Sequence, residues 1–353
     1  MNSRSLRLSV PVMAGIAQWR LSAWLLAGLL LSSIIALQSG AVPVHSGDWL
    51  ALLQNDSPTS AGSYVLWQIR LPRTLFAMLI GASMGISGAL TQALFRNPLA
   101  DPGLLGVSAG AACAAALCIV FLSTLNLPLL GNWRIWLLPA AAFLGALSVC
   151  FSLDKVARWI TPGSIAGLLL TGVALNALAA AVIGLCTYLA NDEQLRSLSF
   201  WTLGSLAGAN WLLVLLLSGM LLIVQRQAGH LARSMNALAL GEAAAAHVGV
   251  DVQQLRRKVI ILVALLAGFA VAWCGMIGFI SLIAPHLVRS LVGGDQRQVL
   301  PLSMLMGGLL LLIADTLARS VAIPAEIPVG IFTALLGSPF FLVLLRSARN
   351  RIG

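Results

Sequence analysis

Charged residues are scarce in this sequence: they make up 9% of 353 residues, against about 25% in a typical soluble domain. Hydrophobic residues make up 59%. A water-soluble core cannot hide that much apolar surface, because a soluble fold also needs a polar exterior. The composition therefore argues against an ordinary soluble globular protein and predicts a protein that crosses a membrane several times.

Lysine is almost absent, which excludes one kind of nucleotide site. The two lysines are Lys155, preceded by Asp154, and Lys258, preceded by Arg257. A phosphate-binding loop of the form GxxxxGK[ST] needs a glycine directly before its lysine. We therefore expect this chain to bind no ATP through such a loop, and no HExxH metalloprotease motif is present either. We predict that the chain is not an enzyme.

Cysteine and histidine also offer little chemistry. The five cysteines are odd in number and lack CxxC spacing, so we interpret them as small buried hydrophobes rather than disulfides or metal ligands. The four histidines are scattered, and His286, in the sequence APHLVR, lies near the inner end of a predicted helix. A haem or metal ligand is one interpretation of His286, but a hydrogen-bonded structural histidine is favoured. We expect no metal site and no cofactor on this chain.

Apolar runs near the length of a bilayer crossing fill most of the chain. They predict an all-α, polytopic membrane protein with one domain over residues 1–353 and about ten transmembrane helices. The predicted spans are 21–38, 65–95, 104–124, 135–153, 165–190, 211–225, 259–274, 276–292, 299–319 and 328–346. Only a hinge at Gly275 separates two of these spans, 259–274 and 276–292. Residues 1–20 are predicted as a basic tail and residues 126–133 as an outer loop.

The basic residues favour one orientation. With ten crossings, the 21 lysines and arginines fall on the side of the N-terminal tail, except Arg70, Arg73, Arg134, Arg196 and Arg319. Cytoplasmic loops carry the excess of basic residues, so both termini are predicted to be cytoplasmic. The formal charge of +10 is therefore attributed to these loops and not to nucleic-acid binding.

Ionisable residues are missing from the centres of nearly all predicted spans. An ion-coupled secondary transporter would need such residues inside the membrane, so that class is disfavoured. Asp315 lies near an outer helix end and has Arg319 four residues later, a favourable pair. A purely structural scaffold is weaker still as an interpretation.

The stretch from Ile69 to Gly110 is the most distinctive in the chain. Gly81, Gly85 and Gly88 recur at spacings of four and three along one predicted helix, where small residues allow close packing in lipid. A polar turn follows, containing Arg96, Asn97, Pro98, Asp101, Pro102 and Gly103. This stretch predicts a membrane crossing, a tight inner loop and a return.

The longest inner loop is predicted over residues 226–258. Within it, residues 238–247 (LALGEAAAAH) favour a short helix, Gly249 then breaks it, and Asp251 can cap the helix that follows. An ordinary connector is one interpretation. A docking element for another protein is the other, because the segment favours helix over loop.

Long motifs in this sequence resemble the permease family of bacterial ABC importers for iron chelates, haem and cobalamin. They are RLPRTL, GASMGISGALTQALFRNPLADPGLLGVSAGA, GMIGFISLIAPHLVRSLVGGDQR and ADTLARSVAIPAEIPVGIFTALLGSPFFLVLL. The resemblance implies the type II importer fold of the cobalamin permease, in the inner membrane. It also implies a homodimer of permeases, two separate ATPase subunits that bind the ATP, and a periplasmic binding protein.

The resemblance also implies roles for particular residues. Arg70, Arg73 and Arg319 would dock the binding protein through its carboxylates; headgroup anchoring or local pairing is the alternative. Leu240, Gly241, Glu242, His247, Gly249 and Val250 would contact the ATPase. The predicted helices 165–190 and 328–346 would line the pore, with a cytoplasmic gate near Pro162, Gly163, Ser164 and Gly167. The cobalamin importer has hydroxyl residues where this chain has Pro162 and Gly163.

The cargo is the least determined part of the prediction. The predicted pore helices are apolar and lack metal ligands, which suits a large chelate with an apolar periphery better than a bare cation. The phrase LANDEQLRSLSFWTLGSL resembles the haem-importing branch more than the cobalamin branch. We therefore predict haem, with a ferric siderophore as the first alternative and cobalamin as the second.

Overall fold

The computed structural model describes residues 9–50, 61–122, 134–323 and 325–349, and every regular element in them is helical. The predicted outer loop 126–133 lies outside the described residues. The α-helices are α1 (Ser9–Gln38), α2 (Ser46–Leu50), α3 (Ala61–Tyr64), α4 (Leu71–Phe95), α5 (Val107–Leu117), α6 (Arg134–Ile160), α7 (Ile165–Leu189), α8 (Asp192–Leu203), α9 (Trp211–Ala239), α10 (Glu242–His247), α11 (Val252–Cys274), α12 (Ile280–Val292), α13 (Gln296–Ser320) and α14 (Val329–Arg349). Shorter π and 3-10 turns are η1 (Val65–Arg70), η2 (Pro102–Leu105) and η3 (Cys118–Leu122).

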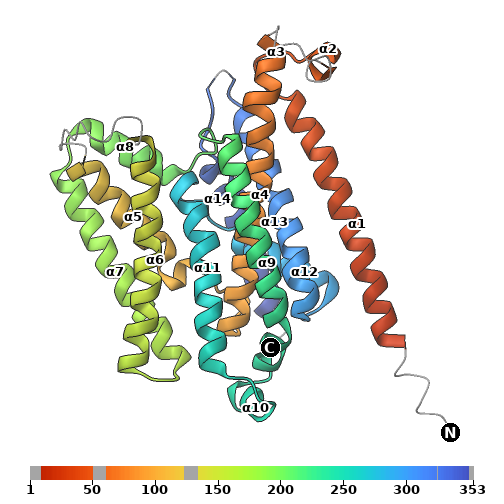
Figure 1. Cartoon of the computed structure of the whole chain (residues 1–353), viewed down its shortest axis with the longest axis vertical. Helices are drawn as coiled ribbons and strands as arrows, with labels where there is room; N and C mark the ends of the chain where they lie inside the picture. Colours follow the sequence, from red (N-terminus) through yellow and green to blue (C-terminus); the bar gives the residue numbers. More distant parts are fainter. Residues whose placement is uncertain (1–8, 51–60, 123–133, 324, 350–353) are drawn as a thin grey trace.

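The all-α, polytopic prediction is confirmed. Within the described residues, seven helical segments are long and apolar enough to cross a membrane, and three shorter apolar helices accompany them. Figure 1 shows these helices side by side, with α2, α3 and α8 at one end and α10 at the other. These ends are called the upper and the lower end below.

Helix α4 forms the centre of the bundle. It packs against α13, α11, α12 and α9, and nearly all of its residues are buried. A Cβ atom at Gly81 or Gly85 would collide with backbone atoms of α13, and one at Gly88 with the carbonyl oxygen of Ser281 in α12. The three glycines therefore let backbones touch, as their spacing predicts.

Helices α5, α6 and α7 form a second group beside this centre (Figure 1), joined to it mainly through α11. Gly110 of α5 and Gly145 of α6 make the close contact within the group, because a Cβ on either residue would meet the other's carbonyl oxygen. Helix α7 is less covered: Leu170, Val173 and Leu178 are exposed on it.

Helix α9 corrects the predicted inner loop 226–258. The helix does not end at residue 225 but continues to Ala239. The reason is an apolar stripe, Ala228, Ala232, Met235 and Leu238, which stays buried while His230 and Arg233 between them are exposed. The short helix predicted at 238–247 is present only over Glu242–His247, because Leu238 and Ala239 belong to α9.

Three other boundaries differ in informative ways. Helix α6 runs about two turns beyond its predicted end, to Ile160, and Arg158 pairs with Asp154 at 2.8 Å on that extension. The predicted outer segment 191–211 contains α8, which begins with a capping box formed by Asn191 and Gln194. The hinge at Gly275 is present, with φ of +69°, and α12 begins only at Ile280.

Candidate functional site

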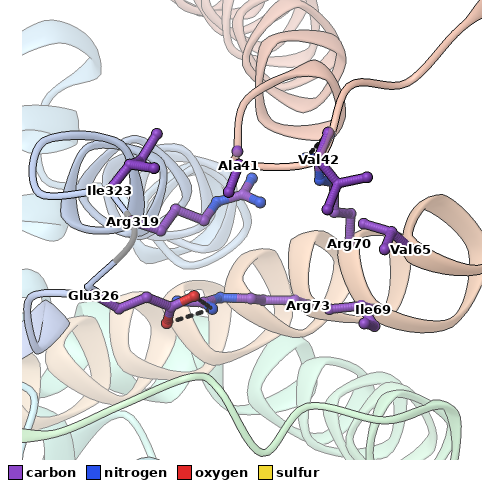
Figure 2. Close-up of a pocket in the computed structure, with 10 residues that line it drawn as sticks. Ala41, Val42, Val65, Ile69, Arg70, Arg73, Arg319, Ile323 and Glu326 are labelled. Carbon is purple, nitrogen blue, oxygen red and sulfur yellow. Dashed lines mark hydrogen bonds and ion pairs between the residues drawn. The ribbon is translucent and has the colours of Figure 1, made fainter. Parts of the chain in front are cut away.

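Arg73 lies between two carboxylates at the upper end of the bundle. Its Nε and Nη2 donate to Asp315, with Nη2 at 2.8 Å from Oδ1, and its Nη1 donates to both oxygens of Glu326 at 2.8 Å (Figure 2). The Asp315 side chain is fully buried, whereas that of Glu326 is 47% exposed. One carboxylate is therefore locked in the bundle and the other faces outward.

The two remaining upper arginines bind mainly backbone. Arg319 lies 3.8 Å from Asp315 and donates to the carbonyl oxygen of Ala36. Arg70 donates to the carbonyl oxygens of Leu37, Gln38 and Val42 at 2.9, 3.3 and 2.6 Å. Arg70 thus caps α1, whose last carbonyl groups have no partner inside their own helix.

A cavity of about 200 Å³ separates these groups (Figure 2). Arg70, Arg73, Arg319 and Glu326 line it, together with small and apolar residues such as Val42. The three arginines predicted from the sequence therefore do meet in one place, but they are buried and paired with this chain's own groups. The geometry shows local pairing, which was the alternative interpretation of these arginines. Docking of a binding protein at them stays a prediction.

Glu326 is the member of this cluster that the sequence analysis missed. It lies in the quoted motif between the last two predicted helices, at the same end as the arginines. The signal in the sequence is its charge, because Glu326 is an acidic residue on the same predicted side of the membrane as Arg70, Arg73 and Arg319.

The polar turn after α4 is held by its own side chains. Arg96 ends α4 in the left-handed region with φ of +49°, and Asn97 Oδ1 accepts from the Leu99 N–H. Asp101 accepts from the Gly103 N–H at 3.0 Å and so caps η2. Burial raises the pKa of Asp101, and the backbone hydrogen bond from Gly103 opposes that rise. Pro102 begins η2, and Pro98 lies in the turn before it.

The predicted ATPase-contacting residues surround α10 at the lower end. Gly241, with φ of +115°, and Gly249, with φ of +84°, bracket the helix in backbone conformations that favour glycine. Leu240 and Val248 are strongly exposed, although both are apolar. The remaining residues fix the turn: His247 Nδ1 lies 2.7 Å from the Ala243 carbonyl oxygen, and the Val250 N–H donates to Ala245.

The predicted gate residues form the turn between α6 and α7. Ser164 caps α7 by accepting from the Gly167 N–H at 3.0 Å, and Gly163 has φ of +82°. Gly167 lies against the Thr161 side chain and has no room for a Cβ. Pro162 is exposed at the surface of the turn.

Arg256 of α11 brings the last two regions together. Its Nη2 donates to the carbonyl oxygen of Gly163 at 3.3 Å and to Oε1 of Glu242 at 3.2 Å. In the sequence, Arg256 is only one of the basic residues whose distribution predicts the orientation. Nothing in the local sequence could have identified its partners, because they are 93 and 14 residues away.

A second cavity, of about 360 Å³, lies beside α14. Leu99, Asp101, Phe279, Leu282 and Phe341 line it, so its wall is mostly apolar. Phe279 has a backbone φ of +67°, which is unusual for a residue with a side chain, and its ring fills the space that a Cβ at Gly337 would need.

In the described part of the chain, no three His, Cys, Asp or Glu side chains gather in a way that could hold a metal ion. His286 lies edge-on to the ring of Phe340, with ring centroids 6.3 Å apart.

Comparison with known proteins gives consistent relatives. The chain is 43% identical to the hemin transport system permease protein HmuU of Yersinia pestis over 92% of this chain and 96% of that protein. It is 40% identical to the vitamin B12 import system permease protein BtuC of Vibrio cholerae over 93% and 94% of the two chains. A solved structure of a metal-chelate type ABC transporter, in an inward-facing conformation, matches with a TM-score of 0.79 and 32% identity over 92% of this chain and 97% of that one. The profile of the FecCD transport family matches residues 28–347, and the chain therefore belongs to that family.

Proposed function

We propose that this chain is the membrane-spanning permease subunit of an ABC importer for haem. The observation that carries the proposal is the 43% identity to a hemin permease over nearly the whole of both chains. The absence of a phosphate-binding loop in the sequence supports a separate ATPase subunit. The membrane is the bacterial inner membrane, with both chain termini and α10 on the cytoplasmic side.

The pore forms between two copies of this chain. Apolar residues of α7 and α14, such as Leu170, Val173, Leu335 and Leu336, are exposed in the single chain, which supports a partner on this side. ATP binding and hydrolysis on two ATPase subunits open the pore alternately to either side. The apolar wall of the cavity beside α14 suits a cargo with an apolar periphery.

The ATPase binds at the α10 end. Leu240 and Val248 are exposed apolar side chains beside a six-residue helix, on the side of the protein that carries most of the basic residues. The test is copurification of the ATPase with a chain carrying both Leu240→Asp and Val248→Asp. Loss of copurification with unchanged folding supports the assignment, and full coupled activity overturns it.

The binding protein docks at the upper end, where three arginines face only two carboxylates. A carboxylate of the binding protein would approach Arg73 on the side held by the half-exposed Glu326. Removing the charge of Glu326 would then leave more positive potential for the partner, so Glu326→Gln should tighten docking several-fold. Glu193→Gln, on exposed α8, is the matched control at the same end. Unchanged affinity for the Glu326 variant would contradict docking at Arg73.

The decisive experiment is uptake by proteoliposomes that hold the permease, the ATPase and the binding protein. ATP-dependent accumulation of haem, and not of a ferric siderophore or cobalamin, is the expected result. Uptake of a siderophore or cobalamin without haem would reject the cargo and keep the importer. The vitamin B12 permease at 40% identity is the observation that keeps cobalamin in the test.

A further inference from the structure

Arg256 joins the α10 region to the turn between α6 and α7 through a charged side chain. It belongs to the second turn of α11 and is 7% exposed. The same nitrogen, Nη2, reaches the Glu242 carboxylate and the Gly163 carbonyl oxygen. A single buried group therefore binds the first residue of α10 and the turn from which α7 begins.

The chemistry of this bridge makes it sensitive to displacement of α10. A guanidinium cannot lose its charge, so once buried it needs a carboxylate or carbonyl oxygens around it. Glu242 is the carboxylate in its salt bridge, and Gly163 offers its carbonyl oxygen from a left-handed backbone conformation. If α10 is displaced, Arg256 either follows Glu242 or keeps Gly163, and in both cases the buried charge loses part of its surroundings.

The neighbouring basic residues do not share this geometry. Arg257 is exposed, and Lys258 is exposed and donates to Gln254 at 3.1 Å within its own helix. The run of three basic residues therefore contains one buried bridge and two surface charges, although the sequence makes them look alike.

We propose that Arg256 is a positioning residue that links displacement of α10 to the turn that begins α7. This inference rests on the proposed function in one respect, namely that the ATPase binds at α10. Movement of the ATPase would reach the gate turn Pro162–Ser164 through the Arg256 side chain. Arg256 touches neither ATP nor cargo and acts only through Glu242 and Gly163.

The test uses the reconstituted complex with Arg256→Met, Arg256→Lys and Arg257→Met. Methionine keeps an apolar chain of similar length at a buried position and removes all donors, so the variant should fold. With Arg256→Met, ATPase copurification and ATP hydrolysis should persist, while cargo moved per ATP falls about ten-fold, as expected for lost hydrogen bonds to a charged group. Arg256→Lys should recover part of that loss, and Arg257→Met should stay near the unaltered chain.

A second measurement separates coupling from mere stability. Hydrogen exchange at the amides of Ser164 and Ile165 should change in the unaltered complex when a non-hydrolysable ATP analogue is added. In Arg256→Met, the α10 amides should still respond and the Ser164 and Ile165 amides should not. An unchanged ratio of cargo to ATP, or an unchanged response at Ser164, would overturn the inference. Failure of the unaltered chain to bind an ATPase would instead reject the proposed function.

Discussion

Helices α4 and α7 are both apolar on almost every side, yet the bundle treats them differently. In the membrane-spanning windows of these helices, 83% of the α4 residues are buried and only 22% of the α7 residues. The α4 glycines meet backbone of α12 and α13, whereas Gly184 of α7 has open space around it. A helix that is apolar all round needs cover on all sides, so α4 is covered by its own chain and α7 needs lipid or another chain. Apolarity alone thus does not say what covers a helix.

The largest expected effect on stability concerns Asp315, which is buried among the helices around α4. Asp315→Ala removes the carboxylate that faces both Arg73 and Arg319, and it leaves two buried cations with weaker partners. We expect a loss of about 3 kcal/mol or more in the free energy of unfolding. Thermal unfolding in detergent measures it, with Glu326→Ala as the half-exposed control. Equal losses of stability in the two variants would contradict the distinction between a buried structural carboxylate, Asp315, and a half-exposed one, Glu326.

Two glycine-to-alanine substitutions, one in each helix, test the comparison between α4 and α7 directly. Gly85→Ala places a Cβ against the Ser303 carbonyl oxygen and should lower stability by about 2 kcal/mol. Gly184→Ala meets nothing and should raise stability by up to about 1 kcal/mol, because alanine favours helix. Thermal midpoints of the isolated chain in detergent should move in opposite directions. A shift in the same direction for both would remove the distinction between the two helices.

A smaller effect on stability is expected at Asp295, which precedes α13 at the lower end of the bundle. Asp295 caps α13 by accepting from the Arg297 N–H at 3.0 Å and also accepts from Asn236 of α9 at 2.7 Å. Asp295→Ala should lower stability by about 1 kcal/mol. Arg297→Ala, which keeps the cap, should lower it less.

The same residue predicts a pH dependence. The side-chain hydrogen bond from Arg297 is the main reason that the pKa of Asp295 is lowered to about 2. A lowered carboxylate pKa stabilises the fold above the ordinary value of 3.8, and this contribution is lost as the pH falls towards 2. The difference in stability between the unaltered chain and Asp295→Ala should therefore be constant above about pH 5 and shrink in acid. A constant difference down to pH 2 would contradict the lowered pKa.

The smallest effect on stability is expected on the uncovered face. Val173→Trp changes an exposed residue of α7 and should alter the stability of the isolated chain by less than about 0.5 kcal/mol. If a second copy covers this face, the dimer fraction measured by light scattering should fall. Leu215→Trp is the control, because Leu215 is an apolar residue of α9 that is also strongly exposed. An unchanged dimer fraction would favour lipid as the cover of α7.

The sequence predicted what depends on local pattern. The glycines of α4, the hinge at Gly275 and the cap at Asp251 follow from spacing and residue type, and the structure contains all three. The end of α9 was predicted at residue 225, which was wrong, because the apolar stripe through Met235 continues the helix to Ala239. That stripe packs against other helices of the bundle, and those contacts are not part of the local pattern.

In the candidate sites, too, the sequence predicted some features and could not predict others. The upper arginines could be grouped because they break the distribution of basic residues, but their burial and the role of Glu326 depend on contacts between helices far apart in sequence. Arg256 is the clearest example, since its neighbour Arg257 has the same chemistry and a different environment. Three-dimensional placement, which no local pattern contains, separates them.

The continuation of α9 also determines how far a partner must reach. Its 29 residues correspond to about 43 Å of helix, while the hydrocarbon layer of a bilayer is about 30 Å thick. If α9 enters the hydrocarbon layer at its first residue, Trp211, the remaining two turns or so hold α10 clear of the lipid tails, at the level of the headgroups or beyond. A partner that binds α10 therefore needs no membrane-inserted surface of its own, and membrane thickness sets the height at which it can bind.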